Sequence, residues 1–158
     1  MKNKIKYSFL IISIFILINF GQGCQKNPAT GDSEFNLLSE SEEDAIGRSE
    51  HQKIIKQFGG EYQNSKLKNY VESLGNFLVS TSELSDKKFT FTILNTPMIN
   101  AFALPGGFVY LTRGLIYLCQ NEAQLAGVIA HEIGHITARH SARRYTKSVG
   151  TGVLLQIL

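Results

Sequence analysis

The sequence predicts an α+β domain in which helices lie beside a small sheet. A segment with helix start and stop signals comes first, and a segment with apolar residues at helical spacing follows it. Three short β-prone segments come next, and a mostly apolar helical run lies near the C-terminal end. Because helices and strands are grouped along the chain rather than alternating, we do not expect a doubly wound parallel sheet. The 158 residues and their ordinary apolar share suffice for one domain at most.

The first two helices are predicted from the signals at their ends. Ser39 and Glu42 form a capping box and Gly59-Gly60 supplies a stop, so the first helix should run from Ser39 to about Phe58. The second helix is expected over residues 65–80, where apolar side chains recur every three or four positions. Packing in a core fully explains that apolar stripe.

Three strands and a short helix should follow. Residues 89–94 alternate like a strand with one buried face, residues 100–104 form a second extended segment, and residues 108–112 form a third. Between the last two, Pro105-Gly106-Gly107 is a turn signal. Residues 111–120 are an apolar stretch that we expect to be helical.

The last helical run carries the pattern H-E-x-x-H at His131-Glu132-Ile133-Gly134-His135. Positions four apart on a helix point the same way and lie about 6 Å apart along its axis, so the two histidines can share one metal ion. Glu132 is placed to take a proton from a metal-bound water, as in zinc metallopeptidases. Asn121 with Gln124 predicts a capping box at the start of this helix. The alternative, two core histidines bonded to backbone carbonyls, leaves a buried Glu132 without a partner.

Residues 1–23 are predicted to be a signal peptide. Lysines precede an apolar stretch, residues 7–20, which is short for a membrane span and typical of a signal-peptide core. Small residues before Cys24 resemble a bacterial lipoprotein cleavage site, which predicts lipidation of Cys24, although Gly21 stands where leucine is usual. An uncleaved N-terminal transmembrane anchor and simple secretion are the alternatives. We therefore expect a membrane-anchored lipoprotein on the periplasmic side of the cell envelope.

Residues 24–38 are turn-rich and are expected to form a lipid-anchored tether. The tether should dock on the domain through Phe35, Leu37 and Leu38. If Cys24 carries lipid, Cys119 has no intramolecular partner and is expected to be a small buried residue. A disulfide between the two cysteines is the alternative.

The formal net charge of +3 comes from the targeting segment. Lys2, Lys4 and Lys6 are its only charged residues, and without them 13 of the 16 basic residues remain, equal to the 13 acidic residues. This balance argues against a nucleic-acid partner. A basic run over residues 139–147 is expected to be the solvated end of the metal helix, where cations complement the helix dipole.

Several short segments between Cys24 and Arg144 occur in a specific order. They are Asn27-Pro28-Ala29-Thr30-Gly31, Asn100-Ala101-Phe102-Ala103-Leu104-Pro105-Gly106-Gly107-Phe108, Arg113-Gly114-Leu115, Asn121-Glu122-Ala123-Gln124-Leu125-Ala126, the H-E-x-x-H segment and Ala138-Arg139-His140. In this order and spacing the chain resembles the HtpX-like and CAAX-prenyl-protease-like gluzincin metallopeptidases, peptidase family M48. Its nearest resemblance is to the BepA-like periplasmic lipoprotein branch, related to the Oma-type mitochondrial enzymes.

The resemblance implies a zinc metalloendopeptidase. One zinc ion would be held by His131 and His135, with Glu132 as general base on a zinc-bound water and then as proton donor. It also implies that a strand presents an edge to which substrate adds as a β-strand, which suits cleavage of unfolded or misfolded envelope polypeptides. An ordinary sheet edge with a tight turn is the alternative. The candidate substrate strand comprises Asn100, Ala101 and Phe102.

A catalytic zinc takes three protein ligands, and the sequence supplies two. In gluzincins the third is a glutamate on a later helix, so we expect it beyond Leu158 and interpret residues 39–158 as the N-terminal portion of the peptidase domain. His140, nine residues after His131, lies about 180° round a continuous helix and could reach the same ion only if the helix broke. The competing function is a non-catalytic envelope lipoprotein that binds extended client chains. A structural lipoprotein with a chance H-E-x-x-H is a third possibility.

Overall fold

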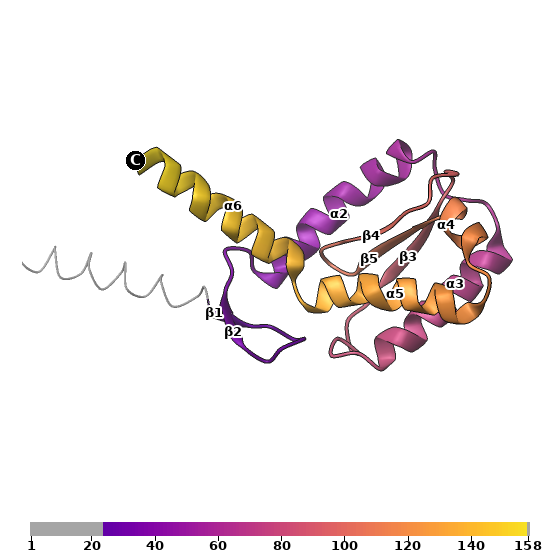
Figure 1. Cartoon of the computed structure of the whole chain (residues 1–158), viewed down its shortest axis with the longest axis horizontal. Helices are drawn as coiled ribbons and strands as arrows, with labels where there is room; N and C mark the ends of the chain where they lie inside the picture. Colours follow the sequence, from indigo (N-terminus) through magenta and orange to yellow (C-terminus); the bar gives the residue numbers. More distant parts are fainter. Residues whose placement is uncertain (1–23, 158) are drawn as a thin grey trace, which may run out of the picture.

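The computed structural model describes residues 24–157 as a three-stranded sheet between helices, with a hairpin at the N-terminal end of this range (Figure 1). The predicted signal peptide lies outside the described residues, and the expected α+β class is confirmed. In chain order the elements are β1 (Cys24–Lys26), β2 (Ser33–Phe35), α2 (Glu40–Gln57), α3 (Ser65–Ser80), β3 (Thr90–Leu94), β4 (Ala101–Leu104), β5 (Phe108–Thr112), α4 (Arg113–Leu118), α5 (Glu122–Thr137) and α6 (His140–Ile157).

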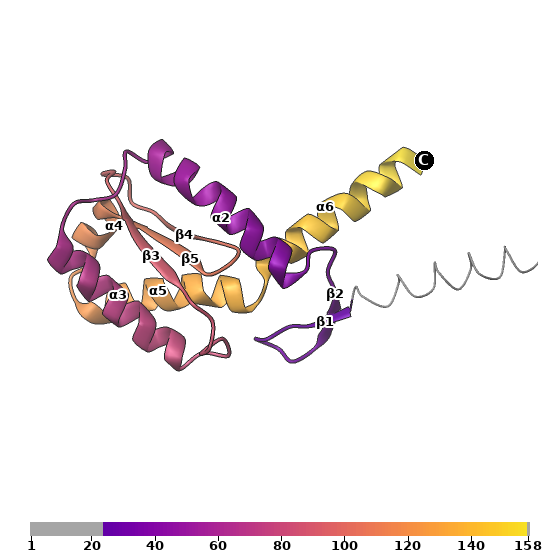
Figure 2. The same ribbon diagram turned by 180° about the vertical axis from the view of Figure 1, so that it is seen from behind.

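Strand β5 lies at the centre of the sheet, parallel to β3 and antiparallel to β4, so β4 is an edge of this sheet. Helix α2 covers one face, where its His51 lies 4.9 Å from Phe108 between ring centroids. Helices α3 and α5 cover the opposite face (Figure 2). Strand β3 is therefore buried on both faces, and the prediction of one buried face was wrong. Thr92, which alternation placed on a solvated face, is buried because its register partner Tyr110 lies under α2.

The predicted helix ends are largely confirmed. Helix α2 starts with the expected capping box: the Glu42 N–H donates to Ser39 Oγ at 3.3 Å, and the Ser39 N–H donates to the Glu42 carboxylate at 2.7 Å. Helix α3 spans the predicted residues. The short helix α4 begins later than expected because Leu111 and Thr112 complete β5, and Thr112 then caps α4.

The hydrophobic core lies between the sheet and the helices α3 and α5. Helix α3 approaches β3 closely at Gly75, where a Cβ atom would lie 2.4 Å from the ring of Phe91. Cys119 packs against this core but is only half-buried, so the prediction of full burial was wrong. Its thiol is free, so the alternative disulfide to Cys24 is not formed. Helix α5 packs against β4 and β5.

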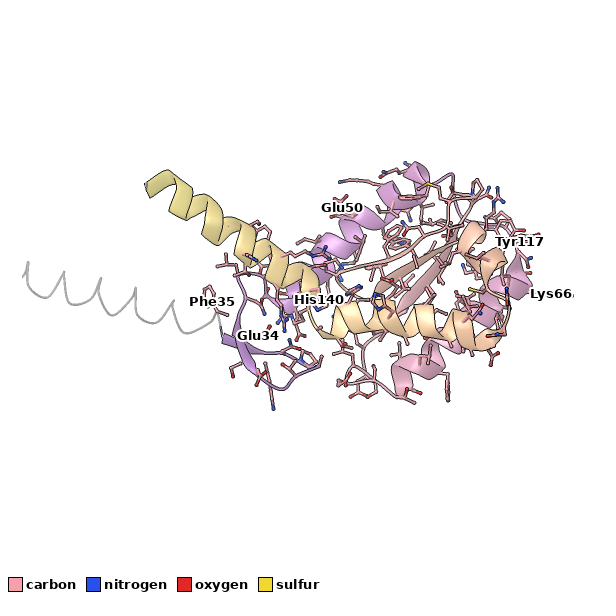
Figure 3. The ribbon with its side chains drawn as sticks, in the orientation of Figure 1. Glu34, Phe35, Glu50, Lys66, Tyr117 and His140 are labelled. Atoms are coloured by element: carbon pink, nitrogen blue, oxygen red, sulfur yellow. The ribbon has the colours of Figure 1, made fainter. Side chains whose placement is uncertain are left out.

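The predicted tether forms the β1–β2 hairpin and then docks on the start of α6. The docking contacts are polar: Glu34, labelled in Figure 3, binds Arg143, and the Leu37 N–H donates to Thr146 Oγ1 at 2.9 Å. The side chains of Phe35 and Leu37 are 55% and 44% exposed. The expectation that these two apolar side chains anchor the tether was therefore wrong.

Candidate metal centre

Helix α5 starts at a polar cap and buries one apolar side. The Asn121 side chain accepts a hydrogen bond from the Gln124 N–H at 3.0 Å. The Gln124 side chain accepts from the Gln120 N–H at 2.8 Å instead of from the cap residue, so the predicted capping box is half formed. The C-terminal half of α5 also lines a cleft, through His131, Glu132, His135 and Ile136. Residues that α5 contributes to the core are Leu125, Ile129, Ile133 and Ile136.

The structure brings the three predicted site residues together on α5. The imidazole rings of His131 and His135 have centroids 4.5 Å apart and planes at 74°. One ligand atom from each of His131, Glu132 and His135 lies within 4.8 Å of the others. Glu132 is 6% exposed, whereas His131 is exposed and His135 is half-buried. The group is therefore open to solvent at His131 and closed at Glu132.

The donor set fits a zinc ion. Zinc binds imidazole nitrogen at about 2.0–2.1 Å, so two nitrogens on one tetrahedral ion lie about 3.4 Å apart. The ligand atoms of His131, Glu132 and His135 lie within 4.8 Å of one another, which is compatible with that distance. Two imidazoles with a neighbouring carboxylate are also the ligand types that zinc prefers. The residues present can therefore hold zinc through His131 and His135, with Glu132 beside the ion.

A cleft of about 320 Å³ opens over this group. One wall is β4 with the turn after it, and the other is α5 with the start of α6. Two of the three candidate substrate-strand residues, Ala101 and Phe102, belong to the first wall. The residues that line the cleft are Glu43, Ala101, Phe102, Ala103, Leu104, Pro105, His131, Glu132, His135, Ile136, Arg139, Ser141 and Arg144.

Asn100, the third candidate substrate residue, lies just before β4 and is not among the residues that line the cleft. Its C=O accepts from the Thr112 N–H at 3.1 Å, and its N–H donates to Thr112 Oγ1 at 3.1 Å. The main chain of Asn100 is therefore already bonded to the end of β5. The cleft wall runs instead from Ala101 through Pro105.

The chain turns sharply after α5, which the sequence did not predict. Helix α5 ends at Thr137, Arg139 adopts the left-handed conformation with φ of 51°, and α6 begins at His140. This break places the Nδ1 atom of His140 2.7 Å from the Nδ1 atom of His135. The expectation of a helix that continues through residues 139–147 was therefore wrong. Burial lowers the pKa of His140.

Two arginines fix this corner (residues 137–143) to the N-terminal part of the domain. Arg139 donates to the Glu43 carboxylate from Nε at 2.8 Å and from Nη2, and also to the Leu38 C=O at 2.9 Å. Arg139 and Glu43 are both buried. Arg143 donates through two nitrogens to Glu34, with Nε 2.7 Å from Oε2. The prediction of a solvated basic run was wrong for Arg139, which is 4% exposed, whereas the side chain of Arg143 stays partly exposed.

The two carboxylates at the corner differ in the direction of their pKa shifts. Burial raises the pKa of Glu43, and this effect outweighs the lowering by the Arg139 hydrogen bond and charge. At Glu34, which stays accessible to water, the hydrogen bond from Arg143 is the main cause of a lowered pKa. The corner therefore contains one carboxylate that resists ionisation and one that favours it.

Sequence reasoning missed Glu43 and Arg144 as residues of the cleft. Glu43 lies in the acidic first turn of α2, and favourable interaction with the helix dipole is a sufficient reason for an acidic residue at that position. Its partner Arg139 is 96 positions away in the sequence. No spacing pattern in the sequence links Glu43 to a residue so far away. Its place in the cleft is therefore visible only in the folded structure.

An H-E-x-x-H histidine pair on a helix packed beside the edge strand of a small sheet is characteristic of a metallopeptidase domain. Comparison with known proteins identifies the family. The sequence profile described as peptidase family M48 matches residues 65–158, which is more than half of the chain. The chain belongs to this family, as the resemblance in its sequence motifs implied.

Two similar proteins match most of the chain, and a third matches about half of it. "Mitochondrial metalloendopeptidase OMA1" of Schizosaccharomyces pombe is 31% identical over 134 residues, which are 81% of this chain and 39% of that protein. "Beta-barrel assembly-enhancing protease" of Escherichia coli is 37% identical over 127 residues, 78% of this chain and 25% of that protein. "Putative beta-barrel assembly-enhancing protease" of Vibrio cholerae is 46% identical over 77 residues, 49% of this chain and 16% of that protein. The chain spans less than half the length of each of these relatives.

Proposed function

We propose that this chain supplies the metal-binding part of a zinc metalloendopeptidase that hydrolyses unfolded or misfolded proteins of the cell envelope. The observation that carries the proposal is the group of His131, Glu132 and His135 in a cleft walled by an edge strand. Membership of peptidase family M48 supports the hydrolytic chemistry. The name of the Escherichia coli relative, beta-barrel assembly-enhancing protease, supports substrates in the envelope.

Glu132 is the proposed general base. Zinc, when bound, supplies polarisation of the scissile carbonyl and a lowered pKa of water. The Glu132 carboxylate lies beside both imidazoles and lines the cleft, so it can reach a water that attacks a substrate there. It accepts a proton from that water on a carboxylate oxygen and then delivers a proton to the nitrogen of the leaving amine.

His131 and His135 are the proposed zinc ligands from this chain. A catalytic zinc takes a third protein ligand, and we place it, as a carboxylate, in a segment of the full-length protein after Leu158. The aligned regions make up 39% and 25% of two relatives, so those proteins have ample further chain to provide such a ligand.

Strand β4 is the proposed binding edge for the substrate main chain. Asn100 is bonded to Thr112, so the alternation of an antiparallel pair makes Phe102 the next residue bonded to β5. By the same alternation, the N–H and C=O groups of Ala101 and Ala103 point away from β5, toward the open edge. Both alanines line the cleft. A substrate strand added here would be recognised through its main chain, which supports action on many unfolded sequences.

The general-base assignment is tested with Glu132→Gln in the full-length protein. We expect this variant to retain its zinc, because both histidines remain, and to cleave unfolded casein about 100-fold or more slowly than the wild type. His135→Ala should lose both zinc and cleavage. Zinc content by mass spectrometry and the rate of casein cleavage are the measurements.

Glu122→Gln is the matched control, since Glu122 lies on the same helix but accepts a hydrogen bond from Tyr70 rather than lining the cleft. We expect this control to cleave casein at close to the wild-type rate. If Glu132→Gln cleaves casein as fast as Glu122→Gln, Glu132 is not the base. A wild-type protein that binds no zinc and cleaves nothing would favour the non-catalytic binding function.

The binding edge is tested with Ala103→Pro. Proline removes the N–H that points to the open edge but removes no hydrogen bond to β5, so the sheet should survive. We expect a lower kcat/KM for casein in this variant, with zinc content unchanged. Ala103→Val, which keeps the N–H, is the control; equal losses in both variants would show that the side chain matters and not the main-chain donor.

We also propose that a lipid on Cys24 anchors the protein in the envelope. Cys24 is the first residue of β1, so a lipid there would hold the hairpin close to the membrane surface. Within residues 24–157 no helix combines the length and the apolar character needed to cross a membrane. The intact mass of protein taken from the envelope fraction tests this. Acyl groups on an N-terminal Cys24 are expected, whereas retention of residues 1–23 would favour an uncleaved anchor.

A further inference from the structure

His140 lies against the metal-binding helix but outside the group that fits zinc. Its Nδ1 atom is 2.7 Å from Nδ1 of His135, and the two rings have centroids 4.9 Å apart. Figure 3 labels His140 at the start of α6, where the chain leaves α5. Two ring nitrogens at hydrogen-bond distance need one proton between them, so one imidazole donates and the other accepts.

The zinc site decides which of the two imidazoles donates. Because Nδ1 of His135 is occupied by His140, Nε2 is the nitrogen of His135 that remains for a metal ion. A neutral imidazole that binds metal through Nε2 carries its proton on Nδ1. His135 is then the donor, and His140 accepts through Nδ1 while its own proton is on Nε2.

We propose that His140 is a positioning residue for the metal centre, which accepts the Nδ1 proton of His135 and so directs Nε2 of His135 toward the zinc ion. Partners of this kind fix both the tautomer and the ring orientation of metal-binding histidines. The inference rests on the proposed zinc site and extends it by a residue that does not itself touch the metal.

The buried corner holds this acceptor in place. The left-handed conformation of Arg139 is uncommon for a residue other than glycine, and it persists because the Arg139 side chain is fixed to Glu43 and to the Leu38 C=O. The position of the first turn of α6 is therefore fixed by the contacts of Arg139 with Glu43 and Leu38, which belong to neither α5 nor α6. His140 reaches His135 from a backbone position that does not depend on the metal.

The tautomers in the metal-free, full-length wild-type protein give the first test. Ring nitrogen shifts from protein labelled with ¹⁵N-histidine distinguish protonated from unprotonated Nδ1 and Nε2. We expect His135 to carry its proton on Nδ1 and His140 to carry its proton on Nε2. The opposite arrangement, or rapid averaging between tautomers at His135, would overturn the proposal. This measurement requires no variant to fold and no metal to bind.

Zinc affinity gives the second test, measured by competition with a chromophoric chelator. His140→Leu removes the acceptor at similar volume and should weaken zinc binding by about 10–100-fold. His140→Asn offers an amide oxygen near the position of Nδ1 and should restore affinity close to that of the wild type. His51→Asn is the control, because His51, on α2, bonds Tyr110 of β5 and lies outside the metal-binding group.

The outcomes separate this inference from the proposed function. If His140→Leu binds zinc as tightly as His51→Asn, His140 has no positioning role. If His140→Asn is as weak as His140→Leu, the acceptor role is wrong and His140 acts as a metal ligand or in folding. Absence of zinc binding by the wild type would overturn the proposed function, while the tautomer measurement still decides the contact between His135 and His140.

Discussion

Helix α5 and the corner after it depend on contacts of very different range along the chain. At the start of α5 the cap joins Asn121 to Gln124, three positions away. At the corner, Arg139 binds Glu43 across 96 positions, and the neighbouring tether contacts span more than a hundred. The metal-binding helix is thus locally specified, whereas the turn that ends it is specified by the N-terminal part of the domain.

This difference separates two properties of the metal centre. The two histidines of the H-E-x-x-H pattern face the same way wherever α5 forms, because helical geometry alone aligns them. The contact from His140 to His135 exists only if the corner is intact. Changes at the cap should therefore lower stability modestly and leave zinc affinity intact, whereas changes at the corner should affect both.

The largest expected effect is that of Arg139→Met. The variant leaves the Glu43 carboxylate buried without its partner, and breaking a buried pair from one side typically costs about 3–5 kcal/mol. We expect a loss of that size in the free energy of unfolding, measured by urea denaturation at neutral pH. Zinc affinity should fall as well, because the turn that carries His140 is no longer held.

Arg144→Met, at an exposed position on α6, is the control and should change stability by less than about 0.5 kcal/mol. The double variant Arg139→Met with Glu43→Leu should recover most of the loss, since apolar replacement of a whole buried pair is often nearly neutral. A double variant as unstable as Arg139→Met would show that the cost comes from the turn at Arg139 and not from the unpaired carboxylate.

The loss in the free energy of unfolding that Arg139→Met causes should also depend on pH. Burial raises the pKa of Glu43, and removal of Arg139 takes away an influence that lowers it, so the pKa in the variant rises further. An acid whose pKa is raised by folding favours the folded state below its unfolded value, about 4.5, and this contribution is lost as pH rises through the folded value. The difference in unfolding free energy between variant and wild type should therefore shrink in acid; a difference independent of pH would contradict the assignment to Glu43.

A smaller effect is expected at the other region, for Asn121→Ala. This change removes the side-chain acceptor for the Gln124 N–H and should cost about 1 kcal/mol of stability. Asn121→Ser keeps a capping oxygen and should be nearly neutral. Because the cap lies more than two turns from the histidines, zinc affinity should stay at the wild-type level in both variants. A loss of zinc affinity in Asn121→Ala would show that α5 needs its first turn to hold the site.

The sequence was sufficient for several features whose determining residues are close together. Ser39 with Glu42 located the start of α2, and the two glycines after Phe58 located its end. The H-E-x-x-H pattern placed His131 and His135 on one helix face, as the structure has them. Each of these features results from contacts within about one helical turn, which a reading of neighbouring residues can detect.

The features that sequence reasoning missed depend on distant partners. Residues 137–141 contain neither glycine nor proline, so nothing local announces the left-handed turn at Arg139. The turn forms because Glu43 and the Leu38 C=O capture the guanidinium. Likewise, Thr92 looked like a solvated strand position because only the folded chain shows that α2 covers that face. Tertiary contacts override the local pattern in both cases.

The smallest expected effect is that of Glu34→Gln. The pKa shift of Glu34, and with it the pH dependence of its contribution to stability, is opposite in direction to that of Glu43. The hydrogen bond from Arg143 lowers the pKa of Glu34, so the ionised form stabilises the folded state above the ordinary value of 4.5. This contribution is lost as pH falls through the lowered folded pKa. We expect the wild type to lose thermal stability on acidification to about pH 3 more steeply than Glu34→Gln.

Glu50→Gln, at an exposed pair with Lys53 on α2, is the control and should keep the wild-type slope. If Glu34→Gln retains that slope as well, the ionised Glu34 does not fasten the tether to the corner, and the contacts of the Leu37 N–H with Thr146 and of the Leu38 C=O with Arg139 do so.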